Sequence, residues 1–259
     1  MIQMEKEKYL IFLNDINKDK PNEFKKVNMK ECPFCNRDEL TDIIDQKGPF
    51  ILLKNKYPTI KDTYQLVLIE TYNCDIDMGD YSVEHMQELI RFGVKHWLKI
   101  EESGEFKSVI FYKNHGPHSG GSLKHPHMQI VGVKNIDYRL NVTRECLNGD
   151  VIWADAGVEL NLAREPKIGF MEFNVKAKGD GSVERLADCI QIVTHYLLHH
   201  FHRGCNSYNL FFYQFSQEEI SVKIVPRFVT SPLFVGYSIP QVSSRAEEVI
   251  QEIQNRYFR

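Results

Sequence analysis

The sequence lacks any apolar run long enough to cross a membrane. Its amino terminus, MIQMEKEKYL, is charged and lacks the apolar centre of a secretory signal peptide. Positive charge is not in excess either, because the 32 lysine and arginine residues are balanced by 35 aspartate and glutamate residues. These absences argue against a membrane protein, a secreted protein and a general binder of nucleic acid polymers. We therefore expect a cytoplasmic protein with neither membrane nor nucleic acid as a partner.

Cysteine is also scarce, with six residues in a chain of 259. This number does not indicate a disulfide framework, and in a reducing compartment such cysteines are free or bind metal. Cys32 and Cys35 form the segment CPFC. Two cysteines separated by two residues in a tight turn can chelate one zinc ion, whereas a redox pair normally opens a helix after a buried strand. Because the flanking residues are polar and typical of a loop, we favour zinc over a redox pair or free thiols.

The segment HPHMQ, from His125 to Gln129, is the strongest candidate for a functional site. It opens into an apolar stretch typical of a strand, on which residues i and i+2 face the same side. One imidazole can then hold the structure while its neighbour does chemistry, because neutral imidazole is a good nucleophile near pH 7. The preceding run of small and polar residues suits backbone contact with phosphates. An isolated pair of histidines is more often structural, but the glycine-rich run and CPFC strengthen the functional interpretation.

Hydrophobic patterns predict the same order of elements twice along the chain. In the first half we expect a helix over 82–104, flanked by strands over 50–54, 65–70 and 107–112. In the second half we expect a helix over 182–204, flanked by strands over 167–175, 207–214 and 220–225. A final helix is expected over 242–259.

This repetition indicates an internal duplication. At an offset of 100 positions, seven residues of the first half recur in the second: Ser82, Val83, Glu84, Ile90, Leu98, Gly104 and Phe111. The second half has no counterpart of HPHMQ. We therefore predict an α+β fold of two halves, residues 1–140 and 141–259, with one active site per chain, in the first half.

The motifs together resemble the galactose-1-phosphate uridylyltransferase branch of the histidine-triad superfamily. That branch also contains ADP-glucose phosphorylases and diadenosine polyphosphate phosphorylases. The resemblance is carried by CPFC, by Asn-Lys-Tyr-Pro from Asn55, and by Asn-x-Gly-x-x-x-Gly-Gly-Ser-x-x-His-Pro-His-x-Gln from Asn114. It covers residues 30–135 well and the second half more loosely. It implies two histidine-triad-like halves, each an antiparallel sheet with flanking helices.

The resemblance also implies an enzyme, a nucleotidyltransferase or nucleoside-diphosphate-sugar phosphorylase. In this family the second histidine of HPH forms a covalent nucleotidyl-histidine intermediate, and that residue is His127 here. Gln129 would hydrogen-bond a phosphate oxygen, and Asn55 would contact the ribose or base. The phosphate-loop positions are Asn114, Gly116, Gly121 and Ser122, with Ser122 bonded to the phosphoryl group.

A structural zinc ion is implied as well. Its ligands would be Cys32, Cys35 and His125, together with a residue about eight positions ahead of Ser82, which is Cys74. Zinc accepts cysteine at a position where histidine is usual in the family. His85 and His118 are the alternative fourth ligands.

The implied partners are a nucleotide or nucleotide sugar, a phosphate or sugar phosphate, and a second copy of the chain in a homodimer. Departures from the family pattern leave alternatives open. Lys113, Pro232 and Ser238 stand where the family has other residues, which puts galactose-1-phosphate specificity in doubt. One alternative is a dinucleoside polyphosphate phosphorylase, which shares the covalent intermediate and differs in the leaving group. The other, motivated by these three departures, is a non-catalytic, zinc-stabilised nucleotide-binding protein.

Three further features of the second half bear on metal and substrate binding. Some family members hold a second metal on a His-x-His strand, but the equivalent strand here offers Lys223-Ile224-Val225, so we do not expect that metal. Arg227 is a candidate for binding substrate phosphate. A histidine cluster lies at the end of the expected helix, where histidines either bind metal or favour the helix macrodipole: His195, His199, His200 and His202.

Overall fold

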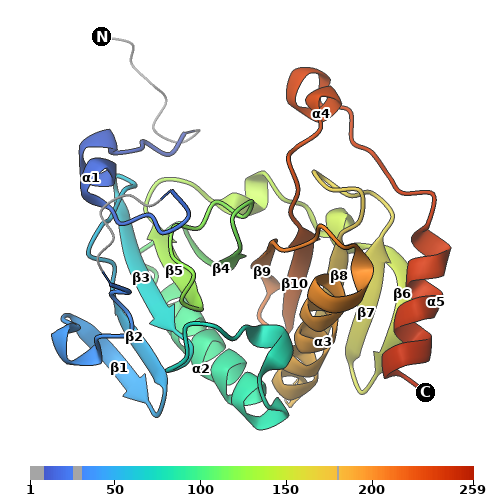
Figure 1. The fold of residues 1–259 in the computed structure, drawn as a ribbon, viewed down its shortest axis with the longest axis horizontal. Helices are drawn as coiled ribbons and strands as arrows, with labels where there is room; N and C mark the ends of the chain where they lie inside the picture. Colours follow the sequence, from blue (N-terminus) through green and yellow to red (C-terminus); the bar gives the residue numbers. More distant parts are fainter. Residues whose placement is uncertain (1–8, 26–30, 180) are drawn as a thin grey trace. The chain divides into compact units, whose positions relative to one another are not determined.

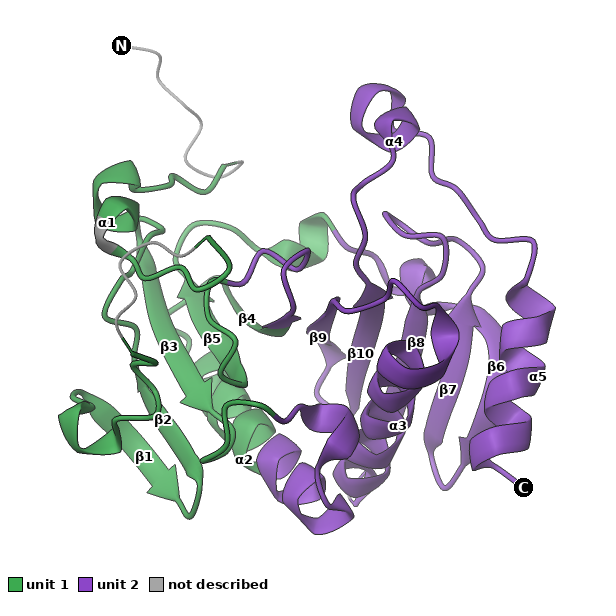
Figure 2. Cartoon of the chain, in the orientation of Figure 1, with its two compact units in different colours: residues 1–75, 92–113, 122–141 green, residues 76–91, 114–121, 142–259 purple. Residues whose placement is uncertain are grey.

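The structure is a computed structural model that describes residues 9–25, 31–179 and 181–259. The fold is α+β, and the chain divides into two compact units, drawn in green and purple in Figure 2. Unit 1 contains residues 1–75, 92–113 and 122–141, and unit 2 contains residues 76–91, 114–121 and 142–259. Among the described residues, no helix has both the length and the apolar character needed to cross a membrane.

Unit 1 is built on an antiparallel sheet (Figure 1). Its strands are β1 (Ile43–Lys47), β2 (Phe50–Lys54), β3 (Thr63–Ile69), β4 (Ser108–His115) and β5 (His127–Val133). Their spatial order is β1-β2-β3-β5-β4, so β5 lies between β3 and β4 and is hydrogen-bonded on both sides. This central position fixes the backbone that carries HPHMQ.

The helical segments of the first half are short, apart from one. They are α1 (Asn14–Asp19), η1 (Arg37–Glu39), η2 (Met78–Asp80), α2 (Val83–Glu102) and η3 (Tyr138–Leu140). Helix α2 confirms the helix expected over 82–104, with the Ser82 hydroxyl accepting the backbone N–H of His85 at 3.2 Å. Its residues up to Arg91 belong to unit 2 and the remainder to unit 1.

The two faces of the unit 1 sheet differ. On one face, Gly93 of α2 approaches Leu68 and Phe111 so closely that an added Cβ would lie 2.6 Å from the Phe111 ring. The opposite face carries the apolar cluster of Ile51, Leu53, Val67 and Ile69, against which Phe34 and Leu40 pack. In the register of β3 and β5, Ile69 pairs with His127 and Val67 with Gln129. Paired residues share a face, so His127 and Gln129 lie on the face covered by the CPFC segment.

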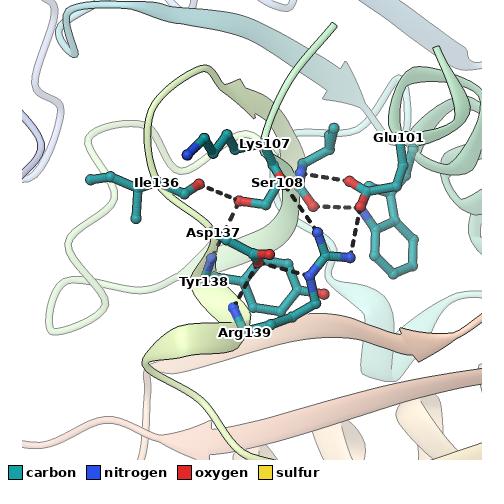
Figure 3. A network of polar contacts seen from close by, with 9 residues as sticks. Glu101, Lys107, Ser108, Ile136, Asp137, Tyr138 and Arg139 are labelled. Carbon is teal, nitrogen blue, oxygen red and sulfur yellow. Dashed lines mark hydrogen bonds and ion pairs between the residues drawn. The ribbon is translucent and has the colours of Figure 1, made fainter. Parts of the chain in front are cut away.

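A polar network ties the segment after β5 to the start of β4 (Figure 3). The Arg139 guanidinium contacts Asp137 at 2.7 Å and Glu101 at 3.0 Å, and donates to the Lys107 carbonyl at 3.0 Å. The Ser108 hydroxyl donates to the Ile136 carbonyl at 2.8 Å. These contacts anchor the far end of the β4–β5 pair, away from HPHMQ at the start of β5.

Unit 2 is also built on antiparallel strands, in the order β9-β10-β8-β7-β6. Its strands are β6 (Gly149–Asp155), β7 (Val158–Ala163), β8 (Phe173–Lys178), β9 (Tyr208–Ser216) and β10 (Glu219–Pro226). Its other helical segments are η4 (Arg144–Leu147), α3 (Ser182–Tyr196), the π-helical turn η5 (Leu197–Phe201), α4 (Pro232–Tyr237) and α5 (Ala246–Tyr257). Strands β8, β9 and β10 with helix α3 repeat the plan of β3, β4, β5 and α2, as the sequence duplication predicts.

The strand expected over 167–175 begins only at Phe173. The cause is the carboxylate of Glu172, which accepts the backbone N–H groups of Lys167 at 2.9 Å and of Ile168 at 2.8 Å. A backbone whose donors are taken by a side chain cannot offer them to a neighbouring strand. The carboxylate of Glu172 also lies 2.9 Å from the ammonium of Lys223, and both side chains are buried.

Candidate functional site

Three thiols and one imidazole of unit 1 converge on a single point. The Nδ1 atom of His125 lies 3.1 Å from the sulfur of Cys74 and 3.5 Å from those of Cys32 and Cys35. The Cys74 sulfur lies 3.3 Å from that of Cys35 and 3.4 Å from that of Cys32. Ligands about 2.0–2.3 Å from one tetrahedral ion have similar mutual separations. The group of Cys32, Cys35, Cys74 and His125 can therefore hold one metal ion, with a donor set that suits zinc.

A backbone carbonyl fixes the tautomer of His125. The Nε2 atom lies 3.0 Å from the carbonyl oxygen of Thr71, which can only accept a hydrogen bond. Nε2 therefore carries the proton, and the lone pair of Nδ1 faces the sulfurs. Arg37 holds the same carbonyl by donating to it at 2.6 Å, and also donates to the Pro49 carbonyl at 3.0 Å. This arrangement orients the imidazole as a metal ligand in the manner usual for zinc sites.

The chemistry of the thiols also fits a cation. Burial, together with hydrogen bonding to the sulfurs of Cys35 and Cys32, raises the pKa of the Cys74 thiol above its ordinary value. Three thiolates so close together repel one another unless a positive ion lies between them. The alternative fourth ligands have other contacts: the ring of His85 packs on Tyr81 at 4.5 Å, and the backbone N–H of His118 donates to the Ser207 hydroxyl at 3.1 Å.

His127 stands at the start of β5 and is 8% exposed. Its Nδ1 lies 2.7 Å from the carbonyl oxygen of His125, so Nδ1 carries the proton and Nε2 keeps its lone pair. Burial lowers the pKa of His127 to about 4; the His125 carbonyl opposes this effect, and the charges of Lys113 and Lys20 add to it. The imidazole is therefore neutral near pH 7. A neutral imidazole with a fixed tautomer is suited to nucleophilic attack through Nε2.

Phe34, inside the CPFC segment, connects the cysteine group to His127. Its ring meets that of His125 edge-on at 5.8 Å and that of His127 at 5.4 Å. Phe34 was not among the predicted site residues, and its place between Cys32 and Cys35 is the sequence signal that could have indicated it. The contact means that the conformation of the CPFC turn bears directly on the His127 ring.

The other candidate residues of unit 1 lie at different distances from His127 along the sheet. Gln129 pairs with Val67 on one side and Tyr112 on the other. It is two residues after His127 and is therefore the next side chain on the same face of the sheet. Asn55 accepts the backbone N–H of Tyr57 at 2.9 Å and donates its own to the Gln65 carbonyl at 2.9 Å. Gln65 pairs with Val131, four residues along β5 from His127, which is about 13 Å of strand.

Ser122 contacts the amino-terminal segment, in which the sequence indicated no site residue. The Ser122 carbonyl accepts the backbone N–H of Glu23 at 2.7 Å, and the Glu23 carboxylate accepts that of Lys124 at 2.7 Å. The side chain of nearby Lys20 contributes positive charge at His127, and burial lowers the pKa of Lys20. Lys20 is thus a cationic residue close to the candidate nucleophile that no sequence motif indicated.

Lys113, which departs from the pattern of the resembling family, forms a buried ion pair. Its ammonium lies 2.7 Å from the carboxylate of Glu70, and both side chains are 1% exposed or less. The pair accounts for the lysine structurally, because each charge compensates the other inside unit 1.

The phosphate-loop candidates Asn114, Gly116 and Gly121 belong to unit 2. Gly116 has φ +80°, and a Cβ there would lie 2.1 Å from the Asn206 carbonyl oxygen, so only glycine fits. The Asn114 side-chain oxygen accepts from Asn209 at 2.6 Å. Gly121 donates its backbone N–H to the Ser119 hydroxyl at 3.2 Å.

No sequence motif marks Asn209, which is buried and links Asn114 to Arg227. Its side-chain oxygen accepts from the Arg227 guanidinium at 2.9 Å, and its amide also donates to the Ser119 carbonyl at 3.0 Å. Arg227, a candidate for substrate phosphate, is therefore held against the loop through one buried asparagine.

Solved structures share this fold. A structure of a uridylyltransferase has a TM-score of 0.69 and 16% identity, covering 87% of this chain and 90% of its own. An ADP-glucose phosphorylase from Arabidopsis thaliana with bound ADP-glucose has a TM-score of 0.71 and 14% identity, covering 94% of each chain. These similarities confirm the fold that the sequence resemblance predicted.

One curated relative matches this chain over only a small part of the relative's length. It is a di-/tripeptide transporter of Lactobacillus helveticus, 29% identical over 149 residues, which make up 57% of this chain and 28% of the relative. The chain thus spans less than a third of that relative.

The chain matches one family over most of its length. The models of the N-terminal and C-terminal domains of DUF4931, a domain of unknown function, match residues 12–136 and 139–258. A crystal structure of a DUF4931 family protein from Bacillus cereus ATCC 10987 is 50% identical, with a TM-score of 0.77, and covers 84% of this chain and 100% of its own. The chain therefore belongs to the DUF4931 family.

Proposed function

We propose that this protein is a nucleotidyltransferase or nucleoside-diphosphate-sugar phosphorylase that works by double displacement on His127. The observation that carries the proposal is the 2.7 Å contact between Nδ1 of His127 and the His125 carbonyl. It leaves the Nε2 lone pair as the nucleophile, in a fold shared with a uridylyltransferase and an ADP-glucose phosphorylase. The residue identities of HPHMQ add the chemical resemblance that fold alone does not supply.

In the first step, the Nε2 lone pair attacks the α-phosphorus of a nucleoside diphosphate sugar. An N–P bond forms, and the bond from phosphorus to the bridging oxygen breaks, so the sugar phosphate leaves with that electron pair. The imidazole then carries a positive charge, which the Nδ1–H bond to the His125 carbonyl stabilises. In the second step, an oxygen of phosphate or of another sugar phosphate attacks phosphorus, the N–P bond breaks, and its electron pair returns to Nε2.

The neighbouring side chains have supporting roles in this proposal. Gln129, on the same face as His127, donates its amide to a non-bridging phosphate oxygen. An amide supplies no proton for hydrolysis, which favours transfer to a second phosphate. Ser122, Asn114, Gly116 and Gly121 are proposed to bind phosphate oxygens, and Asn55 the ribose or base. A dinucleoside polyphosphate would react at the same atom with a different leaving group.

Zinc is the proposed ion of the Cys32, Cys35, Cys74 and His125 group. When bound, it would have a structural role, because thiolates and imidazole occupy four positions and complete a tetrahedral shell. The protein's own contribution is to hold His125, whose carbonyl in turn sets the tautomer of His127. Cytoplasmic location and a homodimer stay predictions; sedimentation of the full chain tests the second.

The test is a half-reaction that needs no second substrate. The full chain is incubated with UDP-glucose, ADP-glucose or GDP-mannose and with isotopically labelled free sugar 1-phosphate. Double displacement predicts that label enters the nucleotide sugar, and that His127→Ala abolishes this exchange while His202→Ala, an exposed histidine outside the site, keeps it. Exchange that survives in His127→Ala contradicts the assignment of the nucleophile. Tight nucleotide binding with no exchange in any pair favours a binding protein instead.

A further inference from the structure

A second group of metal-binding side chains lies entirely within unit 2. Asp80, His195 and His199 each offer one ligand atom, and these atoms lie within 4.8 Å of one another. The Nε2 atom of His199 is 3.2 Å from the carboxylate of Asp80, and the rings of His195 and His199 are 4.5 Å apart. Two ligands of a tetrahedral zinc ion with bonds of about 2.0–2.1 Å lie about 3.3 Å apart. We propose that Asp80, His195 and His199 bind one divalent transition-metal ion.

The turn that carries Asp80 is held against helix α3 at the level of His195. A Cβ on Gly79 would lie 2.9 Å from the Cα of His195, so the turn η2 approaches the helix as closely as only glycine permits. The side-chain amide of Gln191 donates to the carbonyl of Met78 at 3.2 Å and to that of Tyr81 at 2.6 Å. These contacts bracket Asp80 on both sides. The backbone that carries Asp80 is therefore held beside the two histidines.

His195 has the orienting partner that is usual for a metal ligand. Its Nδ1 lies 2.7 Å from the hydroxyl of Tyr257, at the end of α5. Metal-binding imidazoles commonly bond a second group through the ring nitrogen that does not bind the metal. The Tyr257 contact thus leaves Nε2 of His195 as the ligand atom.

The backbone geometry at the two histidines is unusual. Helix α3 ends at Tyr196 and continues as the π-helical turn η5, which contains His199. Such turns are rare and are frequent at functional sites. Favourable interaction with the helix macrodipole would need neither this turn nor the contacts of Gly79 and Tyr257. The π-helical turn and the contacts of Gly79 and Tyr257 together distinguish a preorganised metal site from a chance cluster of surface histidines.

The ligand set indicates which ions fit. Two imidazoles and one carboxylate suit zinc, cobalt or nickel, whereas calcium and magnesium prefer oxygen ligands alone. Three protein ligands leave a coordination position open to water or to an oxygen of a bound molecule. This site is independent of the proposed nucleotidyl transfer. It also contains no thiol, which makes it spectroscopically distinct from the Cys32, Cys35, Cys74 and His125 group.

The test is a cobalt titration of the full chain, purified without a histidine tag. Bound cobalt is counted by equilibrium dialysis with mass-spectrometric metal analysis, and the thiolate-to-cobalt absorption band reports the cysteine group separately. The wild type is expected to bind two ions, only one of which produces the thiolate band. His199→Ala and Asp80→Asn should weaken the second ion by at least about 100-fold and leave the band unchanged.

Matched variants complete the experiment. His202→Ala removes a neighbouring histidine that is outside the group and should retain both ions. Gly79→Ala should weaken the second ion by about 10-fold by displacing the turn, whereas Gly236→Ala, whose Cβ meets nothing within 4 Å, should not. Circular dichroism confirms that each variant is folded. A wild type that binds only the ion reported by the thiolate band, or a second ion unaffected by His199→Ala and Asp80→Asn, overturns the proposal.

Discussion

Strands β5 and β10 hold corresponding places in their units, but their side chains differ in kind. Each is the strand that lies between the first strand of the repeated plan and the strand after the long helix. On β5, His127 and Gln129 occupy one face. The residues of β10 include Ile220, Val222 and Ile224, which pair with the apolar residues Ala177, Val175 and Phe173 of β8. The duplicated architecture thus supplies a central strand in each unit, while chemistry depends on a few side chains placed on it.

The buried ion pairs of the two units make a second comparison. In unit 1, Lys113 on β4 pairs with Glu70, which follows β3. In unit 2, Lys223 on β10 pairs with Glu172, which precedes β8. The pairs occupy different strands and different ends of their sheets. The two ion pairs therefore do not occupy corresponding positions in the two units.

The largest expected effect on activity comes from substituting His127 on β5. His127→Ala removes the proposed nucleophile, and sugar phosphate exchange should fall by at least about 10⁴-fold. Zinc content and thermal stability should change little, because the ring of His127 is not in the metal-binding group. Rates are measured with the labelled exchange assay, using His202→Ala as the control. An exchange rate within about 10-fold of wild type would exclude His127 as the nucleophile.

The next effect tests the buried pair of unit 2. Glu172→Gln leaves the charge of Lys223 buried without compensation and should destabilise unit 2 by about 3–5 kcal/mol. The double variant with Lys223→Met should recover much of this loss. The two tryptophans allow separate readouts, because Trp97 belongs to unit 1 and Trp153 to unit 2. Urea unfolding followed in a Trp97→Phe background should show the loss, and an equal loss in the single and double variants would contradict the pairing.

The same pair predicts a pH dependence. Burial alone would raise the pKa of Glu172, but Lys223 and the backbone N–H of Ile168 outweigh it, so the folded pKa lies below the ordinary value. A lowered pKa contributes stability that is present above the unfolded pKa of about 4.3 and is lost as pH falls through the folded value. Unit 2 should therefore weaken as pH falls below about 4.3. The slope should be smaller in the double variant, and identical slopes would count against this origin.

A smaller effect concerns the metal group of unit 1. Cys74→Ser should weaken zinc binding by at least about 100-fold, whereas Cys74→His should retain it, because zinc accepts either ligand type. Competition with a chromophoric chelator measures both affinities. Equal affinities of wild type and Cys74→Ser would remove Cys74 from the ligand set.

The smallest effect concerns Phe34. Phe34→Ala removes the ring that contacts His125 and His127 and should lower the exchange rate by about 10-fold through misplacement of the nucleophile. Phe34→Leu keeps apolar packing and should lose less. An unchanged rate in Phe34→Ala would show that backbone contacts alone position His127.

The sequence predicted the features that depend on local pattern. Helix α2, strands β2 and β3 and the convergence of Cys32, Cys35, Cys74 and His125 followed from periodicity, spacing and family resemblance. Strands β6 and β7 were not anticipated, because their residues alternate imperfectly between exposed and buried. The early start assigned to β8 was wrong because the Glu172 carboxylate captures the backbone donors of the preceding residues.

The features missed in the sites are contacts between residues far apart in the chain. The carbonyl of Thr71 sets the tautomer of His125 from 54 residues away, and no side-chain pattern marks a carbonyl. Asn209, Lys20 and Tyr257 likewise act through distant partners. Residue type and spacing therefore identified the candidate groups, while their orientation required the folded chain.

The central claim is that His127 becomes covalently nucleotidylated, and intact-protein mass spectrometry tests it most directly. The full chain, loaded with zinc, is incubated with the nucleotide sugars and then digested for peptide mapping at neutral or alkaline pH. The account predicts a mass gain of one nucleoside monophosphate on the peptide containing His127, absent from His127→Ala and removed by added phosphate or sugar phosphate. An adduct on another residue, or none from any nucleotide sugar or dinucleoside polyphosphate in a folded sample, would contradict it.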